Sequence, residues 1–420
     1  MPATPAILSP ATPGDTDFDL VVIGASYAGV GVVAAAREAG FAGRIALIGE
    51  EADLPYQRPP LSKGFLLGKA GLASLPLKAE SFYAEAQIAF MAGRRAVALD
   101  RQTRRVLLDD GSAIGFRTLA LTTGARAAAL RCAGAELDGV LSLRSLDEAR
   151  ALSERLAAAQ AIVIIGGGFI GLEVASAAVT LGKRVSVVEA GPRLIGHAVA
   201  PEISAFMQHV HEERGVTVKL ATKVERIEGE AGRVAAVICA DGSRLPCDLV
   251  LAAVGAVPNT ELAIEAGLAV EDGIVVDAFC RSSDPDIFAA GDCTSHPNAF
   301  ARRRMRLSSV QNAHDQGRVA GHAIAGKLEP YETVPWFWSD QYDVKLQMVG
   351  IGVPGGLAVL RGSMEEGRFS LFRYDGDRLA AIESINRPAD HMMGRRLIAA
   401  GVSPTPEQAG DAGFDLRALT

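Results

Sequence analysis

Cysteine and aromatic residues are scarce in this chain, and it has no long hydrophobic run. Only 5 of its 420 residues are cysteine, and 5% are aromatic. The cysteines form no CxxC pair and have no metal-ligand spacing, so we predict neither a disulfide framework nor a metal site. A reducing, cytoplasmic environment is therefore expected. Because no stretch of about 18 apolar residues occurs, no membrane-spanning helix is expected.

Basic residues are too few to give the chain a positive charge. Lysine and arginine number 42 against 49 aspartates and glutamates, for a net charge of -7. An acidic chain without a nucleic-acid-binding motif is not expected to bind nucleic acid. Residues 1–17 are rich in proline, alanine and threonine and lack the charged start and apolar stretch of a signal peptide. We expect a disordered tail there.

Glycine, by contrast, is plentiful, and it falls where strands should turn into helices. The chain has 45 glycines, and its length predicts two or three domains. An apolar strand at 18–23 meets a glycine, and a helix and a second strand at 44–48 follow. The same plan recurs over 161–189. Fully apolar strands suit parallel sheets covered on both faces, so the repeat predicts two nucleotide-binding domains.

Other elements are expected between and after these two units. The expected strands are 95–108, 119–122, 216–220, 234–240 and 249–254. From about Tyr331 aromatic residues cluster, and strand-like runs at 345–349 and 369–374 precede a final helix at 389–400. We interpret this last part as a third, α+β domain.

The first glycine turn, Gly24 to Gly29, fits a dinucleotide site with one departure. A turn without side chains, placed before a helix, lets backbone N–H groups approach a pyrophosphate. Ser26 stands where a second glycine is usual, but its hydroxyl can itself bond phosphate, and Ala28 keeps the turn small. Glu50 ends the next strand, where a carboxylate can take the ribose hydroxyls. A tight turn without a ligand is the alternative interpretation.

The second glycine turn is an intact GxGxxG motif between a strand and a helix. Glu189 ends the following strand, where it should bond an unsubstituted ribose and repel a 2′-phosphate, which favours NADH over NADPH. Arg193 is near enough in sequence to soften that preference. A structural turn is again the alternative. The turn residues expected to bind the dinucleotide are Gly166, Gly168, Phe169, Ile170 and Gly171.

Several further segments carry a family resemblance. Residues 55–63 (PYQRPPLSK) resemble a segment of the NADH-dependent ferredoxin reductases that serve haem monooxygenases and aromatic dioxygenases. These reductases belong to the FAD-containing pyridine nucleotide-disulfide oxidoreductase superfamily. In the family's order, further resemblances are 122–126 (TTGAR), 254–259 (VGAVPN), 287–292 (IFAAGD), 310–313 (VQNA) and 335–341 (PWFWSDQ). The resemblance runs from about Asp19 to the C-terminus.

The resemblance implies an α/β fold with two Rossmann-like dinucleotide-binding domains plus a C-terminal α+β domain. Residues 18–125 and 251–328 would form a discontinuous FAD-binding domain, 126–250 the NAD-binding domain and 329–420 the C-terminal domain. Gly24, Ser26, Ala28, Gly29 and Glu50 then serve FAD, and the second turn with Glu189 and Arg193 serves NADH. Further residues assigned by resemblance are Arg58, Pro59, Lys63, Val97, Thr123, Gly124, Arg126, Asp292, Val310 and Trp338 for FAD, and Gly255 for NAD.

Three residues are assigned to the redox centre itself. Lys63 is a lone cation in a proline-rich loop, and a cation beside flavin stabilises negative charge on the reduced ring. By resemblance, Glu173 lies on the first turn of its helix and pairs with Lys63 near the flavin N5 edge, and Trp338 lies near the ring. The alternatives are solvated surface charges and a core aromatic. Asp292 follows a buried strand, where its carboxylate can take a ribityl hydroxyl.

The implied reaction passes electrons from NADH to FAD and then singly to a small [2Fe-2S] ferredoxin. Hydride transfer needs the nicotinamide held against flavin N5 and no nucleophile, so Lys63, Glu173 and Trp338 are catalytic only through position and charge. The densest basic run is a candidate docking patch for an acidic ferredoxin, or else a solvated loop. Ser308 stands where the family leads us to expect glutamate, which leaves the partner's identity open. The run consists of Arg302, Arg303, Arg304 and Arg306.

Related enzymes with other chemistry share the same two-dinucleotide plan. Disulfide and peroxide reductases of this plan carry a reactive cysteine after the first domain's second strand, and residues 50–81 contain none. Rubredoxin reductases and flavoproteins that reduce monodehydroascorbate share the same motifs and stay open. From another class, a redox sensor resembling apoptosis-inducing factor is the alternative, but this chain lacks the targeting segment, basic surface and inserted loops that such proteins usually bring.

Overall fold

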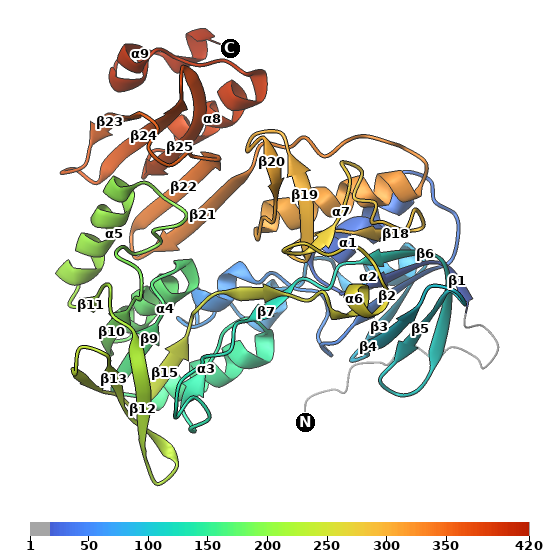
Figure 1. Cartoon of the computed structure of the whole chain (residues 1–420), viewed down its shortest axis with the longest axis horizontal. Helices are drawn as coiled ribbons and strands as arrows, with labels where there is room; N and C mark the ends of the chain where they lie inside the picture. The colour runs from blue at the N-terminus through green and yellow to red at the C-terminus, as the bar shows by residue number, and fades with distance from the viewer. Residues whose placement is uncertain (1–16, 420) are drawn as a thin grey trace.

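The computed structural model describes residues 17–419 and divides the chain into three domains (Figure 1). The first, blue with an orange return, lies at the right of the view. The second, in green, lies at lower left, and the C-terminal domain, in red, lies above it. The expected tail falls outside the described residues except for Asp17, which is the first residue of a strand and so is wrongly assigned to the tail.

A mainly parallel sheet forms the centre of the first domain. Its parallel strands, in spatial order, are β3 (Ile88–Ala92), β2 (Ile45–Gly49), β1 (Asp17–Ile23), β6 (Ala113–Leu121) and β18 (Ile287–Ala289). An antiparallel hairpin of β4 (Ala96–Asp100) and β5 (Arg105–Leu108) continues the sheet from β6. Because β18 comes from much later in the chain, two separate stretches build this domain.

Two helices cross closely over this sheet. They are α1 (Tyr27–Glu38) and α7 (Val310–Ile324). A Cβ at Gly317 of α7 would lie only 2.5 Å from the carbonyl oxygen of Ala28 in α1. Glycine at this position therefore allows the returning helix to press against the helix that follows the first glycine turn.

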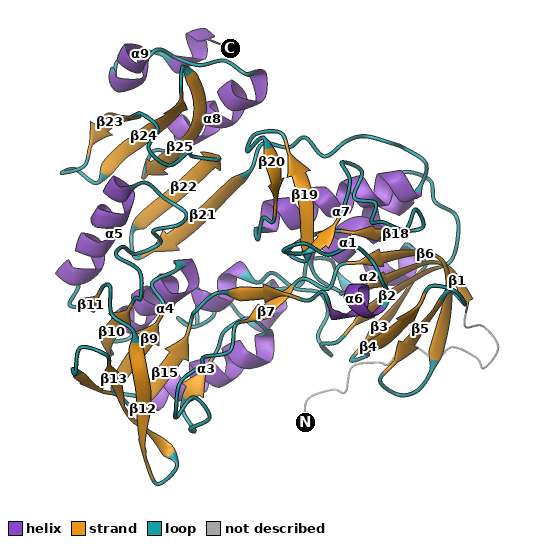
Figure 2. Ribbon diagram, viewed as in Figure 1, coloured by secondary structure: helices purple, strands orange, loops and turns teal. Residues whose placement is uncertain are grey.

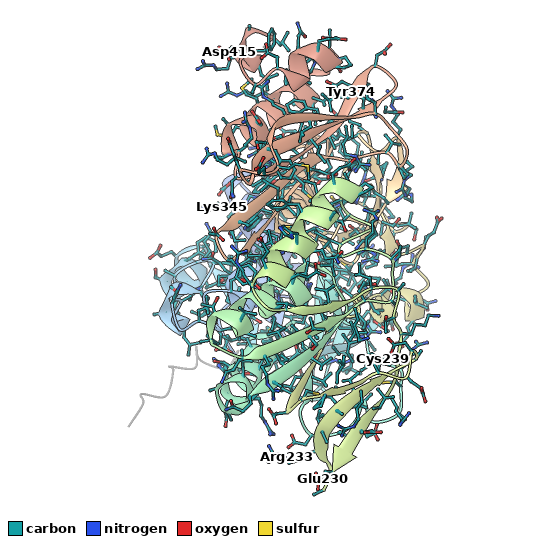
Figure 3. All side chains as sticks on the ribbon, turned by 90° about the vertical axis from the view of Figure 1, so that its left-hand side faces the viewer. Glu230, Arg233, Cys239, Lys345, Tyr374 and Asp415 are labelled. Carbon is teal, nitrogen blue, oxygen red and sulfur yellow. The ribbon has the colours of Figure 1, made fainter. Side chains whose placement is uncertain are left out.

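The second domain repeats the parallel arrangement. Its strands, in spatial order, are β11 (Thr217–Lys219), β10 (Arg184–Val188), β9 (Ala161–Ile165), β15 (Leu249–Ala252) and β8 (Val140–Leu141), all parallel. Its helices are α3 (Leu146–Ala158), α4 (Phe169–Thr180) and α5 (Pro201–Glu213). An antiparallel meander of β12 (Val224–Glu230), β13 (Arg233–Cys239) and β14 (Arg244–Pro246) flanks them. Figure 3 shows Glu230 and Arg233 at its tip, at the opposite end of the molecule from the C-terminal domain.

The C-terminal domain is a five-stranded antiparallel sheet with helices packed on it (Figure 2). Its strands, in spatial order, are β21 (Trp336–Gln341), β22 (Val344–Gly350), β25 (Arg378–Ile385), β24 (Arg368–Asp375) and β23 (Ala358–Ser363). Helices α8 (Pro388–Ala400) and α9 (Pro406–Gly410) cover it. The α+β character expected for this domain is thus confirmed.

Shorter elements complete the three domains and form the link between the first two. Antiparallel strands β7 (Ala125–Ala127) and β16 (Ala256–Pro258) form the two-stranded link between the first two domains. The others are α2 (Glu80–Glu85), α6 (Glu261–Glu265), β17 (Ile274–Val275), β19 (Thr294–Asn298), β20 (Arg303–Met305) and the 3-10 helices at 59–62, 72–74 and 416–419. Within residues 17–419, no helix has the length and apolar character required to cross a bilayer.

Three expectations about elements need correction. The single strand expected at 95–108 is the β4–β5 hairpin, because the Asp100 carboxylate accepts the N–H groups of Gln102 and Thr103 and closes a turn that no glycine or proline marks. The boundary expected after residue 250 falls inside β15, whose apolar run continues in the second sheet to Ala252. The helix expected to be last is followed by α9, which begins with a capping box at Thr405.

Candidate active site

The first glycine turn joins β1 to α1 under a tight backbone contact. Gly24 has a φ of 109°, and a Cβ there would lie 2.2 Å from the carbonyl oxygen of Thr122. The Thr122 hydroxyl donates to the carbonyl oxygens of Ile23 and Gly24, at 2.9 and 2.8 Å. Only glycine fits this corner, and Thr122, the residue after β6, connects it to the neighbouring strand.

The residues around this turn fit a pyrophosphate and a ribose. Ser26 is the N-cap of α1, but its hydroxyl makes no capping hydrogen bond, so it stays free to bind a phosphate oxygen at the helix N-terminus. Ala28, the second residue of α1, is buried and adds little bulk. Glu50 follows β2 with its side chain 70% exposed and its carboxylate 3.8 Å from Arg95. The departure from glycine at Ser26 is therefore compatible with dinucleotide binding.

The second glycine turn has the same corner. Gly166 has a φ of 108°, and a Cβ there would lie 2.3 Å from the carbonyl oxygen of Ala253, whereas a Cβ at Gly168 would meet no atom within 4 Å. The turn is thus closed on its inner side and open outward. The Glu189 carboxylate accepts the N–H groups of Gly167 at 2.7 Å and of Gly191 at 2.6 Å, which fixes it beside the opening.

A cavity of about 330 Å³ lies against this second turn. It is lined by Gly167, Gly168, Glu189 and the loop that follows Glu189. A pocket that combines an open glycine turn with an oriented carboxylate fits the pyrophosphate and ribose of a dinucleotide. The group that Glu189 would select is an unsubstituted ribose, as the sequence predicts.

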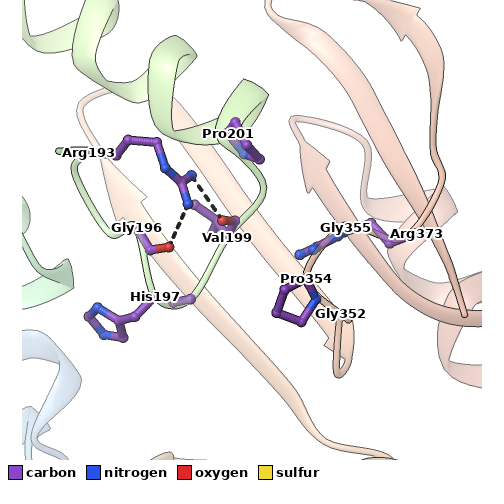
Figure 4. A pocket seen from close by; sticks show the side chains of 10 residues that line it. Arg193, Gly196, His197, Val199, Pro201, Gly352, Pro354, Gly355 and Arg373 are labelled. Atoms are coloured by element: carbon purple, nitrogen blue, oxygen red, sulfur yellow. Dashed lines mark hydrogen bonds between the residues drawn. The ribbon is translucent and has the colours of Figure 1, made fainter. Parts of the chain in front are cut away.

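Arg193 is engaged by its own loop. Its guanidinium donates to the carbonyl oxygens of Gly196 at 2.8 Å and Val199 at 3.4 Å (Figure 4). A second cavity of about 220 Å³ begins here, where the loop faces Pro354 and Arg373 of the C-terminal domain. Because two of its nitrogens are satisfied in the loop, Arg193 offers a 2′-phosphate less than its position in the sequence indicates.

Lys63 and Glu173 form an ion pair between the first two domains. The Lys63 Nζ lies 2.7 Å from the Glu173 Oε2, and the side chains are 20% and 5% exposed. The Ser62 hydroxyl donates to the same carboxylate oxygen at 2.5 Å, and the Ser339 hydroxyl donates to the other at 2.6 Å. The expected pairing is confirmed, but α4 begins at Phe169, so Glu173 lies in the second turn of its helix rather than the first.

A second charged pair involves an arginine that sequence reasoning missed. The Arg144 Nη2 donates to the Asp292 carboxylate at 2.7 Å, and its Nε donates to the carbonyl oxygen of Ala125 at 2.9 Å. The Arg58 guanidinium donates in turn to the carbonyl oxygen of Arg144 and to Glu51. Arg144 and Glu51 stand in no motif, and only folding brings them to Asp292 and Arg58.

The remaining residues assigned to FAD lie in the first domain and its link. Val97 is 40% exposed at a bulge in β4, Pro59 begins a 3-10 helix, and Val310 is the first residue of α7. Thr123, just before Gly124, donates to the carbonyl oxygen of Asn259 at 2.6 Å. Their contacts with FAD stay predictions.

Arg126 and Gly255 lie where the link between the domains begins and ends. The Arg126 guanidinium donates to the Asn259 side chain at 2.7 Å and pairs with Glu261 at 2.8 Å. Gly255, assigned to NAD, has a φ of 111°, and a Cβ there would meet no atom within 4 Å. Arg126 is thus engaged between β7 and α6, and its role toward FAD also stays a prediction.

Aromatic side chains alternate along β21 with a period of two. Trp336 and Trp338 share one side, with ring centroids 5.4 Å apart. Phe337 points to the other side, where its ring centroid lies 4.6 Å from that of Phe169 at the start of α4. Trp338 is only partly buried, so it is not an ordinary core aromatic. Ile170, next to Phe169, is 41% exposed.

The basic run does not form one patch, which corrects the expectation of four docking arginines. Arg304 donates to the carbonyl oxygens of Val276 at 2.9 Å and Ser295 at 2.5 Å. Arg306 pairs with Asp272 at 3.2 Å and bonds the Ser308 hydroxyl. The β20 hairpin turns these two side chains back onto the protein, so that only Arg302 and Arg303 are exposed.

The cysteines of residues 17–419 are all free thiols, and four of the five are buried. Burial raises the pKa of Cys247 to about 12 and also raises the pKa values of Cys280 and Cys293. A thiol kept protonated is a poor nucleophile. These three thiols are therefore not placed to act as redox nucleophiles, and the absence of disulfide-reductase chemistry stays a prediction from residues 50–81.

Known proteins are similar to this chain in sequence and in fold. Rhodocoxin reductase of Rhodococcus erythropolis is 42% identical over 95% of this chain and 94% of its own length. The structure of the ferredoxin reductase for the CYP199A2 system from Rhodopseudomonas palustris superposes with a TM-score of 0.93 and is 44% identical, covering 96% of this chain and 100% of that one. The reductase in a covalent putidaredoxin reductase–putidaredoxin complex also gives 0.93, at 37% identity over 96% and 98% of the two chains.

Two family models match successive parts of the chain, the first over both dinucleotide-binding domains and the second over the C-terminal domain. Residues 336–420 match the family described as reductase C-terminal, which corresponds to the sheet beginning at β21. Residues 18–317 match the pyridine nucleotide-disulphide oxidoreductase family, which spans both glycine turns and the Lys63–Glu173 pair. The chain belongs to the pyridine nucleotide-disulphide oxidoreductase family.

Proposed function

We propose that this protein is an NADH-dependent ferredoxin reductase. It binds FAD in the first domain and NADH in the second, and it passes electrons to a [2Fe-2S] ferredoxin that serves a monooxygenase or dioxygenase. The observation that carries the proposal is the Lys63–Glu173 pair, which joins the loop after the first dinucleotide turn to the helix after the second. The charges of Lys63 and Glu173 therefore lie between the two proposed dinucleotide sites, where electrons would pass from one nucleotide to the other.

The chain's own residues act by binding and positioning. The two glycine corners and the starts of α1 and α4 bind pyrophosphates through backbone N–H groups. Glu50 and Glu189 take the riboses, and the fixed Glu189 carboxylate disfavours a 2′-phosphate. Lys63 would lie beside bound flavin, where its positive charge would stabilise the negative charge that hydride transfer places on the ring. Bound FAD supplies the conversion of a two-electron donor to one-electron steps.

The docking surface for the acceptor includes Arg302 and Arg303. They are the two exposed members of the basic run, and although Arg302 lies 4.0 Å from the Asp375 carboxylate, both side chains are accessible to an acidic partner. A homologous reductase has been solved in covalent complex with putidaredoxin. The free thiols of the described cysteines suit a reducing compartment, and we place the reaction in the cytoplasm.

Two measurements test this function. The purified protein should be yellow, and anaerobic stopped-flow mixing with NADH should bleach it faster than mixing with NADPH. NADH-dependent reduction of cytochrome c should then require an added [2Fe-2S] ferredoxin. Equal activity with rubredoxin alone would make it a rubredoxin reductase instead. Slow bleaching with a long-lived charge-transfer band would contradict the proposal and favour a redox sensor.

A further inference from the structure

A chain of buried hydrogen bonds leads from Glu173 into the C-terminal domain and back to the second domain. The Ser339 Oγ donates to the Glu173 Oε1 at 2.6 Å, and the Gln341 Nε2 donates to the Ser339 Oγ at 3.0 Å. The Gln341 Oε1 lies 2.8 Å from the His211 Nε2, and the Tyr342 hydroxyl lies 3.1 Å from the His211 Nδ1. Four of the five side chains in this series of hydrogen bonds are buried, with exposures between 0% and 5%: Glu173, Ser339, Gln341 and His211.

The spacing of residues along one helix and one strand brings the members of this hydrogen-bond chain together. On α4, residues 169, 173 and 176 fall on one face, since they are spaced by four and three positions. On β21, residues 337, 339 and 341 fall on one side, since they are spaced by two. The matching contacts along the two elements are Phe169 with Phe337, Glu173 with Ser339, and the Ser176 hydroxyl with the N–H of Tyr342.

The direction of each hydrogen bond follows from the one before it. The carboxylate of Glu173, paired with Lys63, can only accept, so the Ser339 hydroxyl must donate its proton. Ser339 then accepts from the amide nitrogen of Gln341, whose oxygen must accept from the His211 Nε2–H. The Nδ1 of His211 is left without a proton and accepts from the Tyr342 hydroxyl. Every link is therefore oriented toward Glu173.

A neutral imidazole is required at one link, and the surroundings of His211 favour it. Burial lowers the pKa of His211 below its usual value, the bond to Gln341 opposes that shift, and the charge of Arg214 adds to it. A charged ring would donate from both nitrogens and leave the Tyr342 hydroxyl without its acceptor. The middle link is an amide, which is not a proton carrier at neutral pH. The chain is built to orient groups rather than to conduct protons.

We propose that Ser339, Gln341 and His211 are positioning residues for hydride transfer, which act by holding the Glu173 carboxylate in the orientation that presents Lys63 to the flavin. This inference rests on the proposed function. Ser62 and Lys63 bind one oxygen of Glu173, and Ser339 is the donor to the other, so its loss frees the carboxylate to rotate. Gln341 and His211 fix the Ser339 hydroxyl in turn, without touching the ion pair.

The kinetic test uses variants along the chain and a control of the same kind. Ser339→Ala and Gln341→Met should each slow flavin reduction at saturating NADH by about tenfold, with the Kd for NADH unchanged. The double variant should be no slower than the slower single one, because both break one chain. Ser339→Thr, which keeps the hydroxyl, should recover most of the rate. Ser384→Ala removes a buried hydroxyl of the same sheet outside the chain and should change the rate by less than about twofold.

Two kinetic outcomes would overturn the proposal. One is a wild-type reduction rate in Gln341→Met, and the other is independent, multiplying effects in the double variant. A spectroscopic readout does not depend on activity: nitrogen NMR of the histidine-labelled protein, with the His211 signal assigned through His211→Gln. We expect the Nε2–H tautomer at neutral pH and its loss in Gln341→Met. A charged or Nδ1–H ring would refute the chain even in an enzyme that NADH reduces normally.

Discussion

Lys63 Nζ lies 2.7 Å from Glu173 Oε2, although the two residues come from different domains. Lys63 follows the 3-10 helix of the proline-rich loop, and Glu173 lies on the helix after the second glycine turn. Removing one partner of a buried ion pair leaves the other charge without compensation, which is destabilising. This contact therefore constrains how the two domains are placed and which charges the proposed redox site carries. Under the proposed function, we expect the same pair to serve both stability and electron transfer.

Glu173→Gln should affect both properties. The amide keeps the size of the side chain but leaves the Lys63 charge without its partner, so we expect the free energy of unfolding to fall by about 3 kcal/mol. Flavin reduction by NADH should also slow by about tenfold or more. Denaturant unfolding and anaerobic stopped-flow absorbance measure the two effects. Asp241→Asn, which breaks the exposed pair with Lys219, is the matched control and should leave both nearly unchanged. Wild-type values in Glu173→Gln would show that the pair is incidental.

Glu189 should set the preference for NADH. Its carboxylate is held beside the second turn by the N–H groups of Gly167 and Gly191, where a 2′-phosphate would meet a fixed negative charge. We expect Glu189→Ala to reduce the ratio of kcat/KM for NADH over NADPH by about tenfold or more, chiefly through KM for NADH. Steady-state kinetics with both nucleotides measures the ratio. An unchanged ratio would mean that selection lies elsewhere in the pocket.

The glycine turns, their strands and helices and the third domain follow from local patterns, which is why the sequence predicts them. Gly24 and Gly166 must be glycine because a side chain at either position would clash with backbone atoms. Such a requirement appears in the sequence as a glycine motif. Lys63 and Glu173 could be paired only through the family resemblance, since neither carries a local signal. The arrangement around Trp338 follows from the two-residue period of β21, which the sequence also shows.

What the sequence could not predict depends on contacts distant along the chain. Arg144 reaches Asp292 and Ser339 reaches Glu173 only after the domains that carry them have packed together. Arg144 stands in no motif, and the segment that contains Ser339 does not show which residue it contacts. The basic run failed as a patch for the same reason. Arg304 finds backbone carbonyls of Val276 and Ser295, which a count of charges along the chain does not reveal.

Arg302 and Arg303 should contribute to ferredoxin binding. Reversing both charges removes the exposed part of the basic run, so we expect Arg302→Glu with Arg303→Glu to raise KM for a [2Fe-2S] ferredoxin by about tenfold at low salt, with less effect at high salt. NADH reduction of the flavin, which needs no ferredoxin, should stay unchanged. Arg233→Glu changes the charge of an exposed arginine at the far tip of the second domain and is the control. A KM for ferredoxin in the double variant equal to that of the wild type would place docking on another face.

His296 should make stability depend on pH. Both of its ring nitrogens are buried without a hydrogen-bond partner among the described residues, and its ring lies edge-on to Tyr331, 5.2 Å between centroids. Burial, with a smaller contribution from the Arg304 charge, lowers the pKa of His296 to about 4. In the unfolded chain this histidine titrates near its usual value of about 6.5.

Between these two pH values the unfolded state binds more protons at His296, so stability falls as the pH is lowered from about 6.5 to about 4. The full effect of this one ring amounts to about 3 kcal/mol, of which roughly half is lost by about pH 5.3. His296→Phe keeps a ring against Tyr331 and cannot be protonated, so its unfolding free energy should depend less steeply on pH in that window. Urea unfolding at several pH values measures the slopes, and His209→Gln, on the exposed side of α5, is the control for removing a histidine. Identical slopes for His296→Phe and the wild type would mean that the ring is already solvated in the folded protein.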